Sequence, residues 1–235
     1  FDNMFTPISI CTPARACLQT GLLPQHTDMI FNWEFQRCRG GVKDLPDSTP
    51  FFSRDLKALG WNLSHNGKWH IGDESRPADT GYDGQFHPGY GFPDKHPHYV
   101  DYLKNLGLTG FNLDNLIDHP MGANRHNYGG EQEGGREASI PAYLAEETIG
   151  SIRKFAREDK PFFTSAQFWG PPSPFRIPAE YLNMYMDRLD EIEPWLNCEA
   201  DLSQKPEIIR IQGEGIFQAN WMDTKARKEM IARYY

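Results

Sequence analysis

Apolar and polar residues alternate along the chain in blocks that predict both strands and helices. Residues 1–10 read as a buried strand, because apolar side chains recur through that segment. Residues 13–23 follow as a helix. Two stretches, 24–48 and 72–96, are rich in Gly, Pro and Asp and are predicted to be irregular. Long irregular stretches in compact domains are usually functional or mobile, so the second is a place to look for functional residues.

The middle of the chain has the pattern of a helix followed by a strand. Residues 53–60 have helical spacing, with Leu56 and Leu59 turned inward and Gly60 as the stop. Residues 61–65 then read as a short strand. Open α/β sheets bind their ligands beyond the carboxyl ends of such strands, so the residues that follow deserve inspection for chemistry.

The second half of the chain alternates between irregular and regular segments. A short helix is predicted over 98–106, and the strongest helical pattern covers 141–157. Residues 110–136 have no clear period and several glycines, so we expect an irregular segment there. The apolar run 161–169 follows a charged turn and reads as a buried parallel strand. Residues 224–235 begin a further helix.

The segment Cys11-Thr12-Pro13-Ala14-Arg15 stands at the junction of the first predicted strand and helix. Pro13 suits a first helical turn, because the N–H that proline lacks is not needed there. Arg15 lies one helical turn after Cys11, so the two side chains can share a face. A helix start directs backbone N–H groups and the positive end of the dipole at an anion. The segment therefore predicts an anion site beside a reactive side chain.

A second cluster of chemistry-bearing residues, Gly67-Lys68-Trp69-His70-Ile71-Gly72, follows the short predicted strand. Both clusters come after strands, so both are expected on the same rim of one sheet. Lys68 supplies a positive charge, and His70 is the residue type used most often for proton transfer. We therefore expect Cys11, Arg15, Lys68 and His70 to line one small hollow that is rich in cations.

Composition sets limits on the class of protein. The 235 residues suffice for one large α/β domain or two small ones, and the hydrophobic content of 39% can fill a core. A formal net charge of −8 argues against a surface that binds nucleic acid or another polyanion. No apolar run has the length of a membrane span, and no signal peptide is recognisable. The four cysteines include no C-x-x-C pair, which argues against a structural zinc site.

The first cluster resembles the signature of the type I sulfatases, C-x-P-[S/A]-R-x-x-L-x-T-G-R. The matching residues are Cys11, Pro13, Ala14, Arg15, Leu18, Thr20 and Gly21. Leu22 stands where the family has its final arginine. The second cluster matches a further sulfatase motif at the expected spacing, and Gly81-Tyr82-Asp83 resembles the Gly-Phe-Asp that follows it in the family. Two motifs at family spacing make the resemblance specific.

The resemblance implies the α/β class and a three-layer α/β/α sandwich of the alkaline phosphatase and sulfatase type. It also implies that residues 1–235 are part of a single catalytic domain, an internal piece of a longer enzyme. In the family, an Asp pair upstream and an Asp with Asn or His downstream hold a divalent cation, usually calcium, and neither set can be placed in this chain. Cys11, as formylglycine, is the one family metal ligand expected here, so we expect an incomplete calcium site.

The same resemblance assigns a role to each of four residues. In the family a maturation enzyme oxidises the cysteine to formylglycine, whose hydrate attacks sulfur, and Cys11 would be that residue. Arg15 would hold the hydrate, Lys68 would clamp the sulfate, and His70 would take a proton during elimination. The alternatives are a buried structural cysteine and a solvated lysine. The two motifs together favour the catalytic roles.

One position departs from the family pattern. Sulfatases often carry a Pro-His-x-Pro run after the strand that corresponds to 161–169, and that histidine contacts the leaving oxygen. Pro172 stands at the histidine position here, and proline cannot donate a proton. His126 and His96, from the two irregular stretches, are the candidates to bind the substrate in its place.

These features imply a sulfuric ester hydrolase that acts on a sulfated carbohydrate or a small aryl or alkyl sulfate, with no nucleic-acid or membrane partner. A phosphonate or phosphate ester hydrolase of the same superfamily shares the motif and is an alternative. Pro172 motivates a third reading, a relative that binds sulfated glycan without cleaving it. Family habit places such proteins in the periplasm, in the lysosome or outside the cell.

Overall fold

The computed structural model describes residues 2–35, 41–110, 112–121, 124–170, 174–194, 203–207 and 223–235. The chain divides into two compact units. The first contains residues Phe1–Asn105 and Ile140–Trp169, and the second contains Leu106–Ser139 and Gly170–Tyr235. All four residues expected in the cation-rich hollow belong to the first unit.

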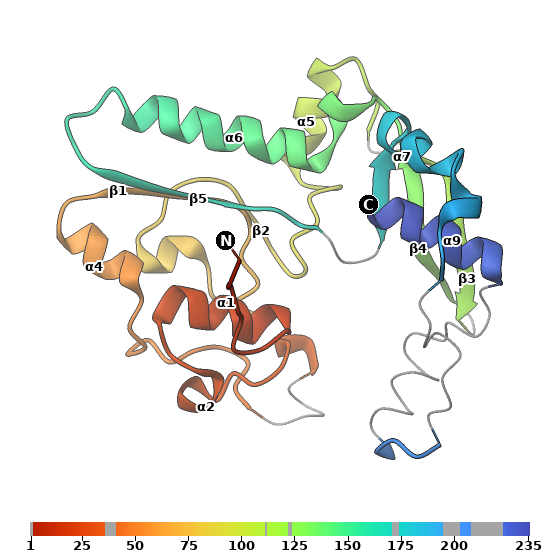
Figure 1. Ribbon diagram of the computed structural model, residues 1–235. Helices are drawn as coiled ribbons and strands as arrows, with labels where there is room; N and C mark the ends of the chain where they lie inside the picture. The colour runs from red at the N-terminus through yellow and green to blue at the C-terminus, as the bar shows by residue number, and fades with distance from the viewer. Residues whose placement is uncertain are drawn as a thin grey trace. The chain divides into compact units, whose positions relative to one another are not determined.

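A parallel three-stranded sheet forms the centre of the first unit (Figure 1). The strand β1 (Asn62–Lys68) lies between β2 (Phe86–His87) and β5 (Phe162–Gln167), and both neighbours run parallel to it. The parallel strand predicted at 161–169 is therefore confirmed, but its burial is not, because Ser165 is the one buried residue of β5. The strand predicted at 61–65 is present but continues to Lys68, so the second motif begins inside the strand.

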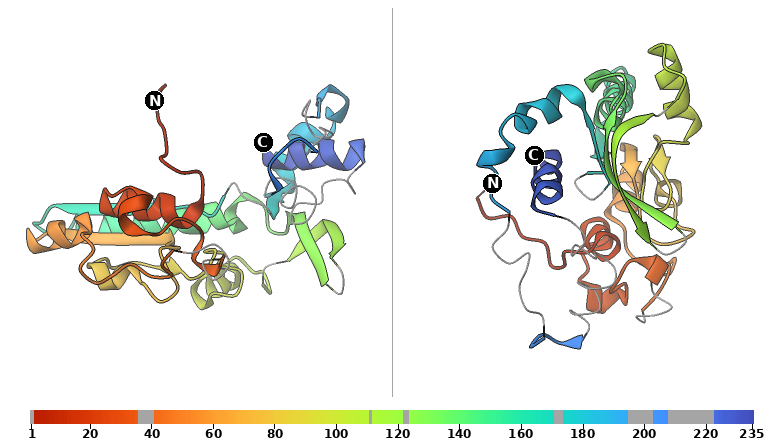
Figure 2. Two further views of the ribbon diagram at one scale, coloured as in Figure 1. Left: turned by 90° about the horizontal axis from the view of Figure 1, so that it is seen from below. Right: turned by 90° about the vertical axis from the view of Figure 1, so that its right-hand side faces the viewer.

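Helices cover both faces of this sheet, which confirms the expected α/β layering. The long helix α6 (Ile140–Phe155) packs on β1 and β5 on one face. On the other face lie α4 (Phe52–Ala58) and α1 (Cys11–Thr20), as Figures 1 and 2 show from different directions. The short helices α2 (Pro24–Thr27) and α5 (Pro97–Asn105) complete the unit.

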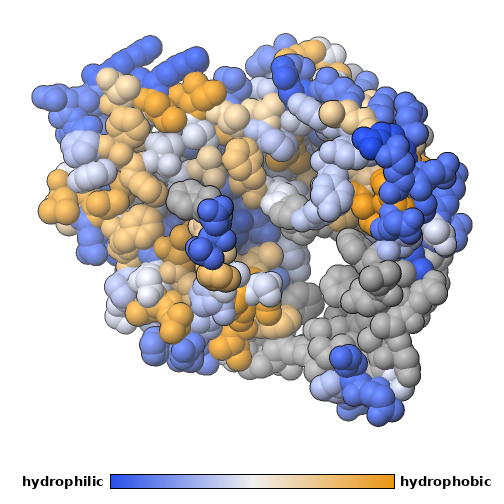
Figure 3. Space-filling view, viewed as in Figure 1, coloured by the Kyte–Doolittle hydropathy of each residue, from blue (hydrophilic) through white to orange (hydrophobic). Residues whose placement is uncertain are grey.

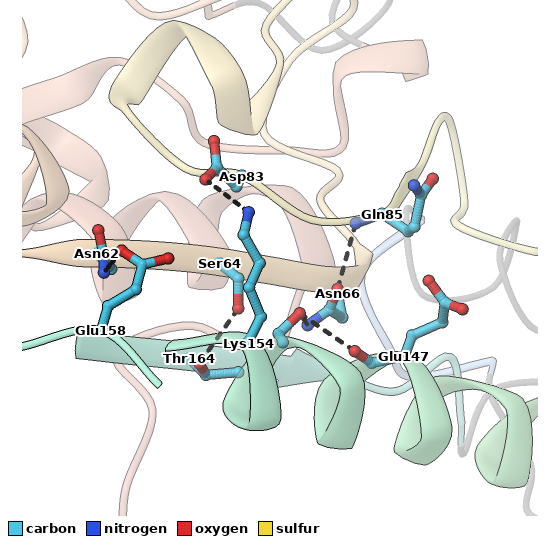
Figure 4. Close-up of polar contacts among 10 residues, drawn as sticks. Asn62, Ser64, Asn66, Asp83, Gln85, Glu147, Lys154, Glu158 and Thr164 are labelled. Carbon is cyan, nitrogen blue, oxygen red and sulfur yellow. Dashed lines mark hydrogen bonds and ion pairs between the residues drawn. The ribbon is translucent and has the colours of Figure 1, made fainter. Parts of the chain in front are cut away.

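Polar contacts fix α6 and the β2 loop to the central strand. The Asn66 side chain donates to Ser151 Oγ of α6 at 3.2 Å and accepts from the backbone N–H of Gln85 at 3.2 Å (Figure 4). Figure 4 also shows Ser64 of β1 against Thr164 of β5, where the two hydroxyl oxygens are 3.2 Å apart. The face of the sheet under α6 is thus held by hydrogen bonds as well as by apolar packing.

The hydrophobic core of the first unit lies beneath the second motif. Its buried members are Ala16, Met29, Phe51, Leu63, Trp69, Ile71 and Tyr82. Trp69 packs edge-on against His65, with ring centroids 5.0 Å apart, and stacks on Phe51. Two residues of the motif, Trp69 and Ile71, therefore belong to the core, and this anchors the residues between and beside them.

Two predictions were wrong, the strand over residues 1–10 and the inward position of Leu59. Residues 2–10 form no strand and are mostly exposed, with Met4 at 82% and Phe5 at 87% exposure. A short apolar run gives no information about whether a partner strand exists, and here it pairs with none in the described part of the chain. Leu59 is 74% exposed, because α4 ends at Ala58 before Leu59 can turn inward. Figure 3 shows hydrophobic surface over the region of α1 and α4.

The second unit contains a mixed sheet in the region predicted to be irregular. Strand β3 (Leu113–Met121) pairs antiparallel with β4 (Asn124–Gln132), which pairs parallel with β6 (Phe175–Pro178). The prediction of an irregular segment over residues 110–136 was wrong, because it was based on the glycines there. At Gly129 an added Cβ would lie 2.8 Å from the carbonyl oxygen of Phe175, so this glycine permits the close pairing of β4 and β6.

Helices α7 (Ala179–Met186) and α9 (Thr224–Tyr234) pack on this mixed sheet. The helix predicted at 224–235 is therefore confirmed, and Asp223 caps its start by accepting from the backbone N–H of Ala226. The remaining elements are four short 3₁₀ helices: η1 (Trp33–Phe35), η2 (Pro77–Thr80), η3 (Arg136–Ala138) and η4 (Leu189–Glu191). Within the described residues, no helix has the length and apolar character of a membrane span.

Candidate active site

Cys11 is the first residue of α1, and its thiol is partly buried among cations. The residue before the helix, Ile10, provides no side-chain cap, and the N–H of Thr12 instead donates to Asn32 Oδ1 at 3.0 Å. The pKa of the Cys11 thiol falls to about 7, chiefly through a hydrogen bond with His70 and against the opposing effect of burial. Electrostatic interactions with Lys68, His70 and Arg15 lower it further. The position therefore favours a negative charge.

Arg15 is held at the rim of the sheet by the ends of two parallel strands. Its Nη1 donates to the backbone oxygen of Lys68 at 2.9 Å and to Gln167 Oε1 at 3.1 Å. Gln167 in turn donates to Ser165 Oγ at 2.7 Å. The guanidinium is therefore fixed from β1 and β5 together, as expected for a cation that positions an anion rather than one that moves freely in solvent.

Lys68 is only 1% exposed, although lysine is rarely buried. Its ammonium lies 4.6 Å from the ring centroid of Trp169 and 5.6 Å from that of Tyr90. Burial lowers the pKa of Lys68, and its hydrogen bond and charge interaction with Cys11 oppose that effect. At Gly91 an added Cβ would come within 2.5 Å of the Lys68 side chain, so glycine allows the loop to close over the lysine stem.

His70 has a buried side chain and an unusual backbone conformation. Its φ is +55°, a left-handed value that is uncommon outside glycine. Its Nε2 lies 2.8 Å from Glu34 Oε1. Because a carboxylate only accepts hydrogen bonds, Nε2 carries the proton, and the buried Nδ1 has no hydrogen-bond partner among the described residues.

The four residues expected to share a hollow are joined by these contacts. Cys11 interacts with His70 and Lys68, and Arg15 bonds to the backbone of Lys68. Such a set can hold a nucleophile, neutralise an anion and accept a proton. The contacts join residues that lie far apart in the sequence, on α1, on β1 and just beyond it.

The other expected substrate-binding residues are placed differently. His96 packs against His87, with ring centroids 4.7 Å apart, and against His98 at 5.4 Å. It thus belongs to a histidine cluster next to α6, where His87 also contacts Tyr143. His126 lies in β4 of the second unit, and its side chain is outside the described residues, as is Pro172.

Four further residues contact the site without having been singled out in the sequence. They are Glu34, Tyr90, Gln167 and Trp169. Each comes from a segment without a local motif, and each reaches the site only through the fold. A charged residue between two aromatic ones, Trp33-Glu34-Phe35, was the single local signal for Glu34.

A metal site is not assembled by this part of the protein. Across the described ranges, no three side chains of the His, Cys, Asp or Glu type are placed to hold an ion. The calcium expected from the sequence resemblance therefore has no ligand set among these residues beyond the position of Cys11.

Comparison with known proteins places the chain in a family. The family model described as Sulfatase matches residues 1–229. An uncharacterized sulfatase of Escherichia coli, YidJ, is 25% identical over 219 residues, which cover 92% of this chain and 39% of that protein. The chain therefore spans about two fifths of the length of that curated relative.

Two solved structures show the same fold at low identity. A phosphonate monoester hydrolase of Agrobacterium radiobacter has a TM-score of 0.65 and 19% identity, with 98% of this chain and 47% of that chain covered. A structure in complex with its substrate D-glucosamine-2-N,6-O-disulfate has a TM-score of 0.51 and 16% identity, with 89% and 34% covered. With the family model over nearly the whole length, these findings show that the chain belongs to the sulfatase family.

Proposed function

We propose that the protein containing this chain hydrolyses sulfate monoesters at the site around Cys11. One observation carries the proposal. The partly buried Cys11, at the start of α1, lies among Arg15, Lys68 and His70, so that a negative charge is favoured at the position where a sulfatase carries its nucleophile. Membership of the sulfatase family supports the same reading.

The environment of Cys11 fits conversion to formylglycine by a maturation enzyme. When present, formylglycine supplies a hydrated aldehyde whose hydroxyl is the nucleophile toward sulfur. Arg15 orients oxygens at this position, and Lys68 neutralises charge on the sulfate. His70 accepts a proton at Nδ1, because Glu34 occupies Nε2.

The rings beside Lys68 favour a ring-bearing substrate. Tyr90 and Trp169 meet edge-on, with centroids 6.3 Å apart, next to the ammonium expected to hold the sulfate. Aromatic faces of this kind pack well against aryl groups and sugars. A structural neighbour has a sulfated amino sugar as its substrate. We therefore propose a sulfated carbohydrate or an aryl sulfate as substrate, ahead of a small alkyl sulfate.

Three further expectations belong to the same proposal. Both compact units are proposed to be parts of one catalytic domain, with calcium ligands supplied from outside residues 1–235. His126 and His96 remain the proposed substrate contacts that compensate for Pro172. The location is proposed to be the periplasm, the lysosome or the outside of the cell, following family habit.

The test uses the full-length protein expressed with the maturation enzyme. Nitrophenyl sulfate, a sulfated monosaccharide, nitrophenyl phosphate and a phosphonate monoester are compared as substrates, with Cys11→Ala as control. Mass spectrometry of the tryptic peptide that ends at Arg15 reports whether the thiol has become an aldehyde. Hydrolysis of sulfate esters that requires Cys11 supports the proposal. An aldehyde-bearing protein that releases no sulfate from any substrate refutes it.

A phosphonate or phosphate ester hydrolase is the second candidate, favoured by one observation. The phosphonate monoester hydrolase has a TM-score of 0.65, higher than the 0.51 of the sulfated-sugar complex. Faster turnover of the phosphonate than of every sulfate ester would select this candidate. Binding of sulfated sugar without turnover, on a chain whose thiol is intact, would select the non-catalytic reading.

A further inference from the structure

We propose that Asn32–Glu34, which we name the positioning segment, fixes both the start of α1 at Cys11 and the tautomer of His70. Glu34 is thus a positioning residue that makes Nδ1 of His70 the proton acceptor. This inference rests on the proposed function for its catalytic meaning. The structural claim, that one short segment orients two groups of the site, stands apart from the identity of the substrate.

The contact between Glu34 and His70 determines which ring nitrogen can act as a base. Their Oε1 and Nε2 atoms are 2.8 Å apart, and the side chains are 19% and 0% exposed. A hydrogen bond to a carboxylate is stronger than one between neutral groups. It therefore holds the imidazole with its proton on Nε2, which leaves the buried Nδ1, without a hydrogen-bond partner among the described residues, as the nitrogen with a free lone pair.

The backbone at His70 needs such an external support. With Asp28, it is one of two non-glycine residues with positive φ in the described part of the chain. Left-handed backbone persists only where the surroundings enforce it, and such positions gather at functional sites. His70 is confined by Glu34, by the edge of Trp33 at 6.5 Å and by Tyr90 at 5.1 Å between ring centroids. Two of these three neighbours belong to the positioning segment.

Asn32 connects the same segment to the nucleophile. Its Oδ1 accepts from the N–H of Thr12, the residue after Cys11, at 3.0 Å. Helix N-termini are usually capped by the residue that precedes them, but Ile10 has no side chain able to do so. Asn32 therefore replaces the local cap from twenty residues away. Cys11 and His70 are thus fixed by positions 32 and 34 of one short turn.

A purely structural ion pair is the competing explanation. It would make Glu34 important for stability while leaving the chemistry of Cys11 unchanged in the folded fraction. The positioning role instead predicts an effect on the reactivity of Cys11 in protein that is fully folded. The two explanations therefore differ in a quantity that can be measured per folded molecule.

The first measurement uses the full-length protein made without maturation, so that Cys11 remains a thiol. Iodoacetamide forms an S–C bond with Cys11 and loses iodide, while His70 Nδ1 takes the thiol proton. Trypsin cleaves after Arg15, so mass spectrometry follows Cys11 and Cys17 on separate peptides. At one neutral pH, Glu34→Gln is expected to slow alkylation of Cys11 about tenfold, and Glu34→Ala more. Cys17 serves as the internal reference.

The second measurement uses the matured enzyme. Glu34→Gln is expected to lower kcat about 10- to 100-fold with little change in KM, because the side chain acts on the base and does not bind the substrate. Asn32→Ala is expected to lower kcat less, since it loosens the helix start only. Glu74→Gln is the matched control, because Glu74 is exposed and its side chain lies outside the site.

The outcomes separate this inference from the proposed function. If Glu34→Gln alkylates Cys11 at the wild-type rate, or loses activity only in proportion to its folded fraction by circular dichroism, the positioning role is wrong. A wild-type enzyme that hydrolyses no sulfate ester refutes the proposed function but leaves the alkylation result meaningful. If Glu34→Ala does not fold, Glu34→Gln carries the comparison, because glutamine keeps the size of the side chain.

Discussion

Replacement of Gly67 by alanine tests whether the rim of the sheet is as closely packed as the structure indicates. Gly67 lies in β1 opposite Gln167 of β5, and its N–H donates to the oxygen of Gln85 at 2.7 Å. Its φ is +107°. An added Cβ would lie 2.1 Å from the backbone oxygen of Gln167, far inside van der Waals contact.

Two costs add at this position. A left-handed backbone costs an alanine about 1–3 kcal/mol. The clash adds about 1–3 kcal/mol of overpacking, because the opposing atom is backbone and cannot rotate away as a side chain would. The sum, about 2–6 kcal/mol, is a large part of a typical folding free energy of about 5–15 kcal/mol. We expect Gly67→Ala to lower the free energy of unfolding by about 2–6 kcal/mol.

Urea unfolding of the full-length protein, followed by circular dichroism, measures this quantity. Gly60→Ala is the matched control, because Gly60 also has positive φ, +86°, but an added Cβ there meets no atom within 4 Å. Gly60→Ala should cost only the strain of the left-handed backbone, about 1–3 kcal/mol. If both variants lose the same free energy of unfolding, β1 and β5 are not packed as closely at Gly67 as described.

Two further predictions concern His87 and Trp169. Burial lowers the pKa of His87 to about 4, so the unfolded chain binds its proton at a higher pH than the folded chain, and stability should fall from about pH 6.5 toward pH 4. Thermal melts across this range should show a shallower decline in His87→Gln, and an unchanged slope would contradict the burial of an unprotonated imidazole. Trp169→Ala should raise KM about tenfold for nitrophenyl sulfate and much less for methyl sulfate, since it removes a ring beside Lys68. Equal effects on both esters would show that the ring does not contact the leaving group.

The sequence predicts the site better than it predicts the elements around it. Cys11, Arg15, Lys68 and His70 stand in short motifs that can be read from the sequence. The strand-end rule accounts for the position of Lys68 and His70, whereas Cys11 and Arg15 lie on a helix that no strand precedes among the described residues. Gln167 could not be found in this way, because its bond to Arg15 joins residues 152 positions apart. Long-range contacts of this kind leave no local pattern.

The wrong secondary-structure predictions have a similar cause. Apolar residues in 1–10 predicted a strand, but a strand also needs a partner, and that information is not local. Glycines in 110–136 predicted irregular structure, although Gly129 serves a close strand pairing. Local patterns succeeded where the element is a helix stabilised by its own spacing, as in α6 and α5.

The second motif contributes residues to both the core and the candidate site, and this links stability to the proposed catalysis. Trp69 and Ile71 belong to the buried core, whereas Lys68 contacts the rings beside Cys11 and His70 contacts Glu34. Trp69 and Ile71 flank His70 in the chain, and Trp69 follows Lys68, so a change in either core residue should displace the neighbouring site residues. The backbone oxygen of Lys68 strengthens this link, because it lies 2.9 Å from Arg15 Nη1 and 3.1 Å from His65 Nε2, and His65 packs on Trp69. A change in the packing of Trp69 should therefore shift His65 and the Lys68 carbonyl group, and with that group the position of Arg15.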